Sequence, residues 1–293
     1  MQIRLTPIAA LAACLAWSQA PVLEEKANLS SPDGKLTLSF SLSEKGEPMY
    51  SLNYGDTPVV LPSRLGFELR GTVKATELDF KGTGITKKDS KPSYMFNSAF
   101  SVIGTENGSC DEVWNPVWGE EKSIRNNYNE LLVKLQQDGT ERRVNLRFRL
   151  FDDGLGFRYE FPGEQELNYF VIKEELSEFA MAGDHTAWWI PGDFDTQEYE
   201  YAETRLSGIS AELPAHVCGN SSQTLFSKSG VQTSMLMRTD DGLYISIHEA
   251  ALNNYSCMHL DVDEKSLVLR SFLTPDAQGW KGYMQAPCNT PWR

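Results

Sequence analysis

The sequence predicts an all-β protein, organised as a large two-sheet β-sandwich. Apolar and polar residues alternate along many short segments, and turn-forming residues separate these segments. Alternation places the apolar side chains of a strand on one face, and two sheets that bury such faces against each other form a sandwich. No segment has apolar residues at helical spacing over three turns, and no internal repeat is evident, which argues against propellers and β-helices.

The expected strands follow one another along the chain. In Leu36–Leu42 and Tyr50–Tyr54 every second residue is apolar. Val144–Leu150 and Phe157–Phe161 alternate in the same way. Further candidate strands are 65–69, 131–135, 234–237, 243–247 and 267–269, and residues 173–179 could form one or two helical turns.

Turn chemistry marks the connections between these strands. Ser31–Gly34, Asp152–Gly156 and Thr239–Gly242 contain glycine and aspartate, which tolerate the positive φ that tight hairpins require. The second of these turns lies between two alternating runs, so residues 147–161 are predicted to form a long β-hairpin. No proline- or serine-rich linker interrupts the chain, and residues 21–293 are therefore predicted to form one domain.

The first twenty residues have the pattern of an export signal. Arg4 precedes a short apolar run that ends in small residues. The run is too short to span a bilayer, so residues 1–20 are predicted to be a signal peptide cut after Ala20. Alternatively, Leu11–Cys14 fits a bacterial lipoprotein box in which Cys14 is lipidated. Both interpretations imply export, and no other segment is long and apolar enough to cross a membrane.

The charge balance limits the classes of partner. The formal net charge is −13 at pH 7, and removal of the signal with Arg4 brings it to −14. No basic stripe is available to neutralise phosphates, which argues against nucleic acids and anionic membranes as partners. The balance is compatible with a neutral ligand such as a sugar, or with a hard cation.

Four cysteines follow the signal, at positions 110, 218, 257 and 288. An exported chain can oxidise them, and Cys257 with Cys288 is one candidate disulfide. The sequence has no C-x-x-C pair, so it gives no indication of zinc binding or dithiol redox chemistry.

The densest functional signal lies between Asp184 and Tyr201. Five carboxylates and five aromatic rings surround a Pro-Gly turn there: Asp184, Asp193, Asp195, Glu198 and Glu200, with Trp188, Trp189, Phe194, Tyr199 and Tyr201. Carboxylates bind hydroxyl groups or a hard cation, and rings stack on the apolar face of a sugar. The loop lacks the central glycine and distal glutamate of an EF-hand, but one carboxylate could bind a calcium ion shared with other segments. A plain surface loop is the alternative.

A second candidate surface is the segment Trp114–Glu130. Its Trp, Glu and Arg side chains could contact a sugar or a partner domain. Alternatively, Trp114 and Trp118 plug the edge of the sandwich while Glu120 and Glu121 face solvent, and composition favours this second interpretation.

The remaining residues and motifs that could carry catalytic or metal-binding chemistry indicate no further site. The four histidines, at positions 185, 216, 248 and 259, lack metal-site spacing and are expected to be structural. Nucleophile-elbow, P-loop and dinucleotide-binding patterns are absent, which excludes the corresponding hydrolase, NTPase and Rossmann classes.

Six motifs resemble glycoside hydrolase family 97. They are Val117–Lys122, Arg125–Leu131, Phe148–Phe161, Trp189–Asp193, Asp195–Tyr199 and Pro287–Arg293. The resemblance covers essentially all of residues 21–293 and implies a β-super-sandwich similar to galactose mutarotase. In the family a (β/α)8 barrel with the catalytic acids and a small C-terminal β domain follow the sandwich. The resemblance therefore implies that this chain contributes no catalytic residue and is inactive alone.

The same resemblance implies a role in a periplasmic, calcium-dependent α-glycosidase of the α-glucosidase type. The sandwich would supply one calcium ligand, and the matching residue is Glu198. Gln197 and Asp195 would shape its loop, and Trp114 and Trp118 would line the surface that faces the barrel. The implied partners are α-glucan oligosaccharides or other α-glycosides, and the catalytic barrel itself.

Two other functions stay open on the residues alone. A stand-alone carbohydrate-binding module would use the aromatic loop. A mutarotase-like epimerase would need His185, His248 and Glu249 to converge on one face of a sheet.

Overall fold

The computed structural model describes residues 26–70, 78–79, 84–85, 93–163, 165–217, 224–277 and 279–293. The expected signal peptide with Cys14, and also Cys218, lie outside these residues. Within them strands dominate, and the helical elements are α1 (Ile209–His216) and two short 3-10 turns, η2 (Gln165–Leu167) and η3 (Leu206–Gly208). The all-β prediction is confirmed.

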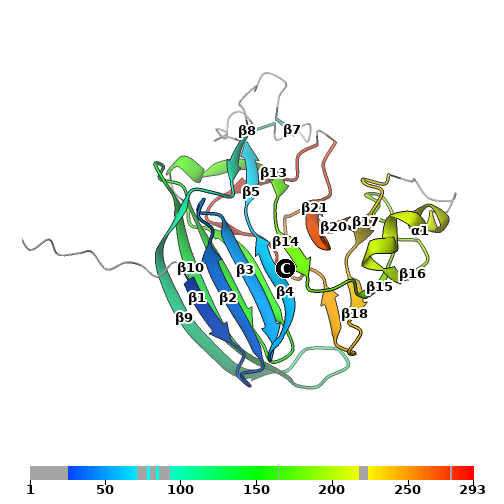
Figure 1. Cartoon of the computed structure of the whole chain (residues 1–293). Coiled ribbons are helices and arrows are strands. Elements are labelled where there is room, and N and C mark those ends of the chain that lie inside the picture. Colours follow the sequence, from blue (N-terminus) through cyan, green and yellow to red (C-terminus); the bar gives the residue numbers. More distant parts are fainter. Residues whose placement is uncertain are drawn as a thin grey trace, which may run out of the picture.

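Two large antiparallel sheets form the sandwich (Figure 1). The first has the order β1 (Lys26–Ser30), β2 (Leu36–Leu42), β3 (Pro48–Tyr54), β4 (Thr57–Arg64), β14 (Glu178–Met181), β21 (Val268–Leu273), β20 (Met258–Asp263), β17 (Gly230–Gln232). The second has the order β23 (Cys288–Asn289), β12 (Leu155–Phe161), β11 (Arg143–Leu150), β10 (Ile124–Gln137), β9 (Phe100–Trp114).

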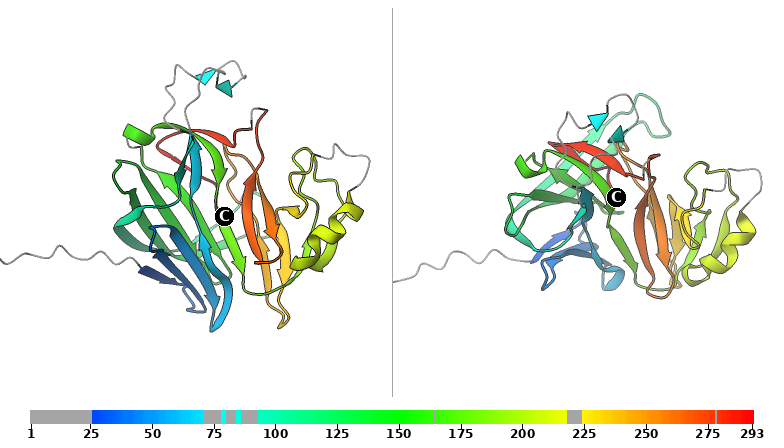
Figure 2. Two further views of the ribbon diagram at one scale, coloured as in Figure 1. Left: turned by 45° about the horizontal axis from the view of Figure 1, so that its top comes forward. Right: turned by 90° about the horizontal axis from the view of Figure 1, so that it is seen from above.

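Three smaller sheets complete the described chain. One, at an end of the sandwich, has the order β22 (Gly282–Gln285), β13 (Tyr169–Glu175), β5 (Phe67–Arg70), β8 (Ser93–Phe96). Another has the order β16 (Ala202–Arg205), β15 (Thr186–Trp189), β18 (Met235–Arg238), β19 (Tyr244–Ile247). With α1 it lies to one side of the sandwich (Figure 2). The third pairs β6 (Leu78–Asp79) with β7 (Gly84–Ile85).

An aromatic core joins the two large sheets. In β11 the residues Val144, Leu146, Phe148 and Leu150 are buried, while the residues between them are half-buried. The ring of Phe148 lies 6.1 Å from that of Phe40 in β2, and Phe157 lies 5.2 Å from Tyr50 in β3. The alternation in the sequence thus corresponds to the buried faces of facing strands.

Several expectations on secondary structure are confirmed. Residues Leu36–Leu42 are β2 with the predicted bounds. The predicted hairpin over residues 147–161 is the antiparallel pair β11–β12, with Arg147 opposite Arg158.

Two expectations on secondary structure are wrong. Residues 173–179 are not helical: they span the end of β13, two linking residues and the start of β14. Within them Glu175 is buried as the partner of the distant Arg293, and Ser177 is buried as a donor to Glu175. Helix α1 was not expected: it buries only Ile209 and Leu213 and contains Pro214, so it lacks an apolar stripe that could be recognised.

The expected disulfide is also wrong. Cys257 and Cys288 are free cysteines, as is Cys110. The thiol of Cys257 lies 2.9 Å from the hydroxyl of Thr274, and burial raises the pKa of Cys288 to about 11.

Candidate functional site

The loop after β15 carries the predicted calcium ligand, and Asp193 anchors this loop. Asp193 is 2% exposed, and its carboxylate accepts hydrogen bonds from the Thr224 hydroxyl at 2.6 Å, the Asp195 amide at 2.8 Å and the Tyr199 hydroxyl at 2.9 Å. Burial opposes ionisation of this carboxyl, but the three donors outweigh it and lower its pKa. Asp193 is therefore a charged structural anchor that ties the loop to Thr224.

Two buried side chains hold the backbone of the same loop. His259 of β20 has its Nε2 2.9 Å from the carbonyl oxygen of Asp193, and burial lowers the pKa of this histidine. A neutral ring that donates through Nε2 satisfies this geometry. The amide of Gln232 donates to the carbonyl oxygens of Thr196 at 2.6 Å and Pro191 at 3.2 Å. The loop backbone is thus held at Pro191, Asp193 and Thr196.

Glu198 lies on the exposed part of this anchored loop. Its backbone amide donates to the hydroxyl of Thr196 at 3.1 Å, and its side chain is exposed, as are those of Gln197 and Asp195. A carboxylate oxygen is a hard donor of the kind that Ca²⁺ prefers. No group of three His, Cys, Asp or Glu side chains in the described part of the chain could hold a metal ion. Glu198 therefore fits a calcium ion only as one ligand among others from outside this set.

The structure separates the other members of the acidic and aromatic stretch. Trp189 is buried in the core, whereas Trp188 stacks on Tyr244 with ring centroids 6.4 Å apart. Asp184 accepts hydrogen bonds from the amide and hydroxyl of Ser207 at 2.9 and 2.7 Å. The five carboxylates thus do not form one cluster, and the sequence overstated the density of this site.

A polar pocket of about 440 Å³ opens beside the loop of Glu198. Gln197 of the loop and the 2%-exposed Gln232 of β17 line one side of it. The residues after β19 form another wall, including His248 and Glu249. The pocket joins the anchored loop to the segment that follows β19.

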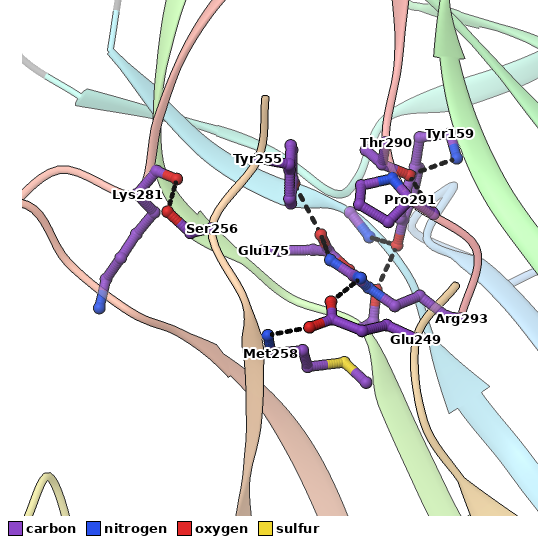
Figure 3. A network of polar contacts seen from close by, with 12 residues as sticks. Tyr159, Glu175, Glu249, Tyr255, Ser256, Met258, Lys281, Thr290, Pro291 and Arg293 are labelled. Atoms are coloured by element: carbon purple, nitrogen blue, oxygen red, sulfur yellow. Dashed lines mark hydrogen bonds and ion pairs between the residues drawn. The ribbon is translucent and has the colours of Figure 1, made fainter. Parts of the chain in front are cut away.

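A buried ionic network fixes that segment (Figure 3). The guanidinium of Arg293 donates two hydrogen bonds to the Glu175 carboxylate, at 3.0 and 2.9 Å, and one to Glu249 at 2.6 Å. Glu249 also accepts from the backbone amide of Met258 at 2.9 Å. The Tyr255 hydroxyl donates to Glu175 at 2.7 Å. One arginine thus ties the pocket wall to the sandwich.

The network has well-defined charges. Burial opposes ionisation of Glu175, but Arg293 outweighs it and lowers the pKa of this carboxyl. Burial likewise opposes the charge of Arg293, whereas Glu175 raises its pKa further above the ordinary value. Burial raises the pKa of Glu249. The Arg293–Glu175 pair is therefore the ionised centre of the network.

The backbone of the same C-terminal segment bridges two sheets. Arg293 and Phe157 of β12 exchange hydrogen bonds of 2.8 and 2.9 Å. Trp292 exchanges hydrogen bonds of 2.9 and 3.0 Å with Ala250, which follows β19. The Trp292 ring lies under the guanidinium groups of Arg149 and Arg158, at 4.8 and 4.5 Å.

The residues expected for an epimerase do not converge. His185 directly precedes Thr186 in β15. Thr186 lies opposite Arg238 of β18, and Arg238 lies opposite Tyr244, the first residue of β19. His248 follows the opposite end of β19. At roughly 3.3 Å per residue, about 15 Å of strand separates the two histidines.

The tryptophans of the β9–β10 hairpin project from the molecule. Trp114 is 49% exposed and Trp118 is 87% exposed, so the expectation that they plug the sandwich edge is wrong. The paired strands β9 and β10 extend as far as Trp114 and Ile124, and the tip between them carries Trp118 away from the core. Glu120 and Glu121 are exposed, as expected.

Comparison with known proteins identifies the relatives of this chain. Residues 29–293 match the family model described as Glycosyl-hydrolase 97 N-terminal. The chain is 22% identical over 302 residues to a retaining alpha-galactosidase of Bacteroides thetaiotaomicron. The match covers 96% of this chain and 40% of that protein. No helix in the described part of the chain is long and apolar enough to cross a membrane.

Solved structures give the same result. A family 97 enzyme of Pseudoalteromonas sp. strain K8 in complex with acarbose is 30% identical with a TM-score of 0.72, over 91% of this chain and 35% of that enzyme. A variant of that enzyme in complex with panose gives a TM-score of 0.71 at the same identity and coverage. A beta-arabinopyranosidase, 18% identical with a TM-score of 0.67 over 91% of this chain and 39% of its own, shares the fold. The chain thus spans about 35–40% of the length of these relatives.

Proposed function

Because the chain belongs to the glycosyl-hydrolase 97 N-terminal family, we propose that it completes the active site of a calcium-dependent α-glycosidase. Its contribution is Glu198, as one ligand of a calcium ion whose other ligands come from the catalytic part of the enzyme. The observation that carries this proposal is the rigid presentation of an exposed carboxylate: Asp193, Gln232 and His259 hold the loop, and Glu198 stays at the surface.

Bound calcium would supply a fixed positive charge at the active site. The part of this chain is to position one carboxylate. Gln197, which lines the polar pocket, and the half-buried Thr196, whose hydroxyl accepts from the Glu198 amide, orient the loop tip. Anchoring on Asp193 limits the motion of Glu198, so little entropy is lost when a ligand binds.

The chemistry of bond cleavage is assigned to the remainder of the enzyme. Glycoside hydrolysis needs two carboxyl groups at a separation of about 5–9.5 Å, one of them kept protonated by its surroundings. In this loop Asp193 is ionised and committed to three donors, while Asp195 and Glu198 are exposed. The chain alone is therefore expected to be inactive.

The proposed substrates are α-glucan oligosaccharides. The support is the 30% identity to an enzyme that was solved in complexes with acarbose and panose. Another α-glycoside is the alternative, supported by the 22% identity to a retaining alpha-galactosidase. Export to the periplasm, by a signal peptide over residues 1–20 or as a lipoprotein through Cys14, stays part of the proposal.

The proposal is tested in a chimera. This chain replaces the matched N-terminal portion of the Pseudoalteromonas enzyme, and panose hydrolysis is titrated with calcium after chelation. Glu198→Gln should raise the calcium concentration for half-maximal rate at least about ten-fold, since even residues behind metal ligands are worth 10–100-fold. Glu200→Gln, at an exposed acid two residues away, is the matched control and should change nothing. Equal calcium dependence of both variants would contradict the proposal.

A stand-alone carbohydrate-binding module is the second candidate, favoured by the exposure of Trp118. Calorimetry of this chain alone with maltotetraose separates the two functions. Saturable heat that Trp118→Ala abolishes would support the module, whereas no heat is expected if the chain acts only with a catalytic partner.

A further inference from the structure

A second hollow, the strand groove, lies between the sandwich and the small sheet that contains β19. It has a volume of about 760 Å³, and its walls are mainly apolar. Leu52 and Val60 line it from β3 and β4, Met181 from β14, and Ile245 from β19. The groove also reaches Trp292 and Arg293, and the C-terminal end of the chain lies near the middle of the views in Figures 1 and 2.

Two sheet edges border this groove. In the described chain β19 is the last strand of its sheet, and its neighbour on the inner side is β18. On the other side β12 begins at Leu155, and the C-terminal segment pairs with it as far back as Phe157. Edge strands carry backbone groups that can pair with a further strand.

The hydrogen bonds of the C-terminal segment define the register of such a strand. Trp292 is bonded to Ala250 on the β19 side, and Arg293 is bonded to Phe157 on the β12 side. Successive residues of an antiparallel strand bond alternately to either side. The next positions would therefore lie opposite His248, Leu155 and Ser246 in turn, along the groove.

The same alternation determines which side chains of the incoming strand face the groove and which face outward. The Trp292 ring lies on the outer face, over Arg149 and Arg158, whereas the Arg293 side chain is 0% exposed on the inner face. Every second residue after Arg293 would therefore point inward, against Leu52, Val60 and Met181. A strand with alternating apolar and polar residues matches these walls.

We propose that the strand groove is a docking site for one β-strand, which joins β12 to β19 into a continuous sheet. The occupant is the segment that follows the N-terminal portion in the longer family 97 relatives. The matched portion is N-terminal and covers 35% of the Pseudoalteromonas enzyme, so polypeptide continues beyond it there. This inference goes beyond the proposed function, because it requires neither calcium nor catalysis.

The test uses a labelled heptapeptide with the sequence that follows the matched portion in the Pseudoalteromonas enzyme, added to this chain. Fluorescence anisotropy should show saturable binding. A peptide of the same composition, reordered so that its apolar residues are consecutive, should bind at least ten-fold more weakly. Equal binding of both peptides, or no binding of either, would overturn the proposal.

A variant of the groove edge makes the test specific. Ser246→Pro removes an edge amide that the register places toward the incoming strand, and should weaken binding at least ten-fold. Ser246→Ala, the matched control, should bind like the original chain. Should the proline variant unfold, hydrogen exchange on the unaltered chain decides: the peptide must slow exchange at Ser246 and His248, and unchanged rates would refute the docking site.

Discussion

Replacement of Arg293 by methionine tests how strongly the buried network stabilises the protein. The substitution keeps an unbranched side chain of similar length and removes the positive charge. The guanidinium makes three charge-assisted hydrogen bonds, and the side chains of Arg293 and Glu175 are both 0% exposed. Arg293→Met therefore leaves a buried carboxylate without its counter-charge.

The magnitude follows from this burial. Removing one partner of a buried ion pair costs about 3–5 kcal/mol, since the other charge stays desolvated. The three lost bonds point to the same range or above it, because each bond to a charged group is worth about 1.5–3 kcal/mol. Tyr255 and Ser177 still donate to Glu175 and lessen the loss. We expect a destabilisation of about 4 kcal/mol, a large part of the 5–15 kcal/mol of a typical domain.

Urea unfolding at pH 7, followed by tryptophan fluorescence, measures this loss. Arg125→Met is the matched control, because Arg125 also makes two hydrogen bonds to one carboxylate, Asp111, but both side chains are more than half exposed. The control should lose no more than about 1 kcal/mol. Equal losses in the two variants, or a loss below about 1 kcal/mol in Arg293→Met, would refute the reasoning.

The effect should depend on pH in a defined direction. In the original chain the pKa of Glu175 is lowered in the folded state, so its contribution is present above the unfolded pKa near 4.5 and is lost as the pH falls. Without Arg293, burial raises this pKa instead, and the penalty is largest near neutrality. The difference in unfolding free energy between the two proteins should therefore shrink from pH 7 to pH 4.

Three further predictions concern the loop and the exposed hairpin. Asp193→Asn should cost about 2 kcal/mol, because it weakens the three hydrogen bonds to a charged acceptor, and faster amide exchange at Asp195 would report the loosened loop. Burial lowers the folded pKa of His259, so its contribution to the unfolding free energy is present above about pH 6.5 and is lost on acidification. The unfolding free energy measured in urea should therefore fall less between pH 7 and 5 in His259→Gln than in the original chain. Trp118→Ala should change the unfolding free energy by no more than about 0.5 kcal/mol, since the ring is 87% exposed, and a larger loss would place it in the core.

The strands were predictable where one face of a strand is buried and the other is not. Residues Leu36–Leu42 follow this rule, and their bounds agree with β2. Helix α1 was not predictable, because only two of its residues are buried and Pro214 interrupts the helical pattern. Strand order was also beyond the sequence, since pairs such as β4–β14 join segments far apart in the chain.

The candidate site was predictable only in its location. Composition identified the acidic loop, but could not distinguish Asp193, the buried anchor, from the exposed Glu198. That difference depends on Thr224 and His259, which are 31 and 66 residues away along the chain. Arg293 and Glu175 were missed as a pair for the same reason, being 118 residues apart. The motif Pro287–Arg293 carries part of the family resemblance, but the burial of Arg293 is not visible in the sequence.

The position of Arg293 also has a consequence for the order in which the molecule can form. A chain emerges N-terminus first, at about 5–20 residues per second during synthesis. Glu175 thus emerges on the order of 10 s before Arg293, 118 residues later, becomes available. During this interval Glu175 has no cation to accompany it into the interior, and the edge of β12 has no closing segment. The sandwich can begin to assemble from its N-terminal hairpins, but the buried ion pair can form only after Arg293 arrives.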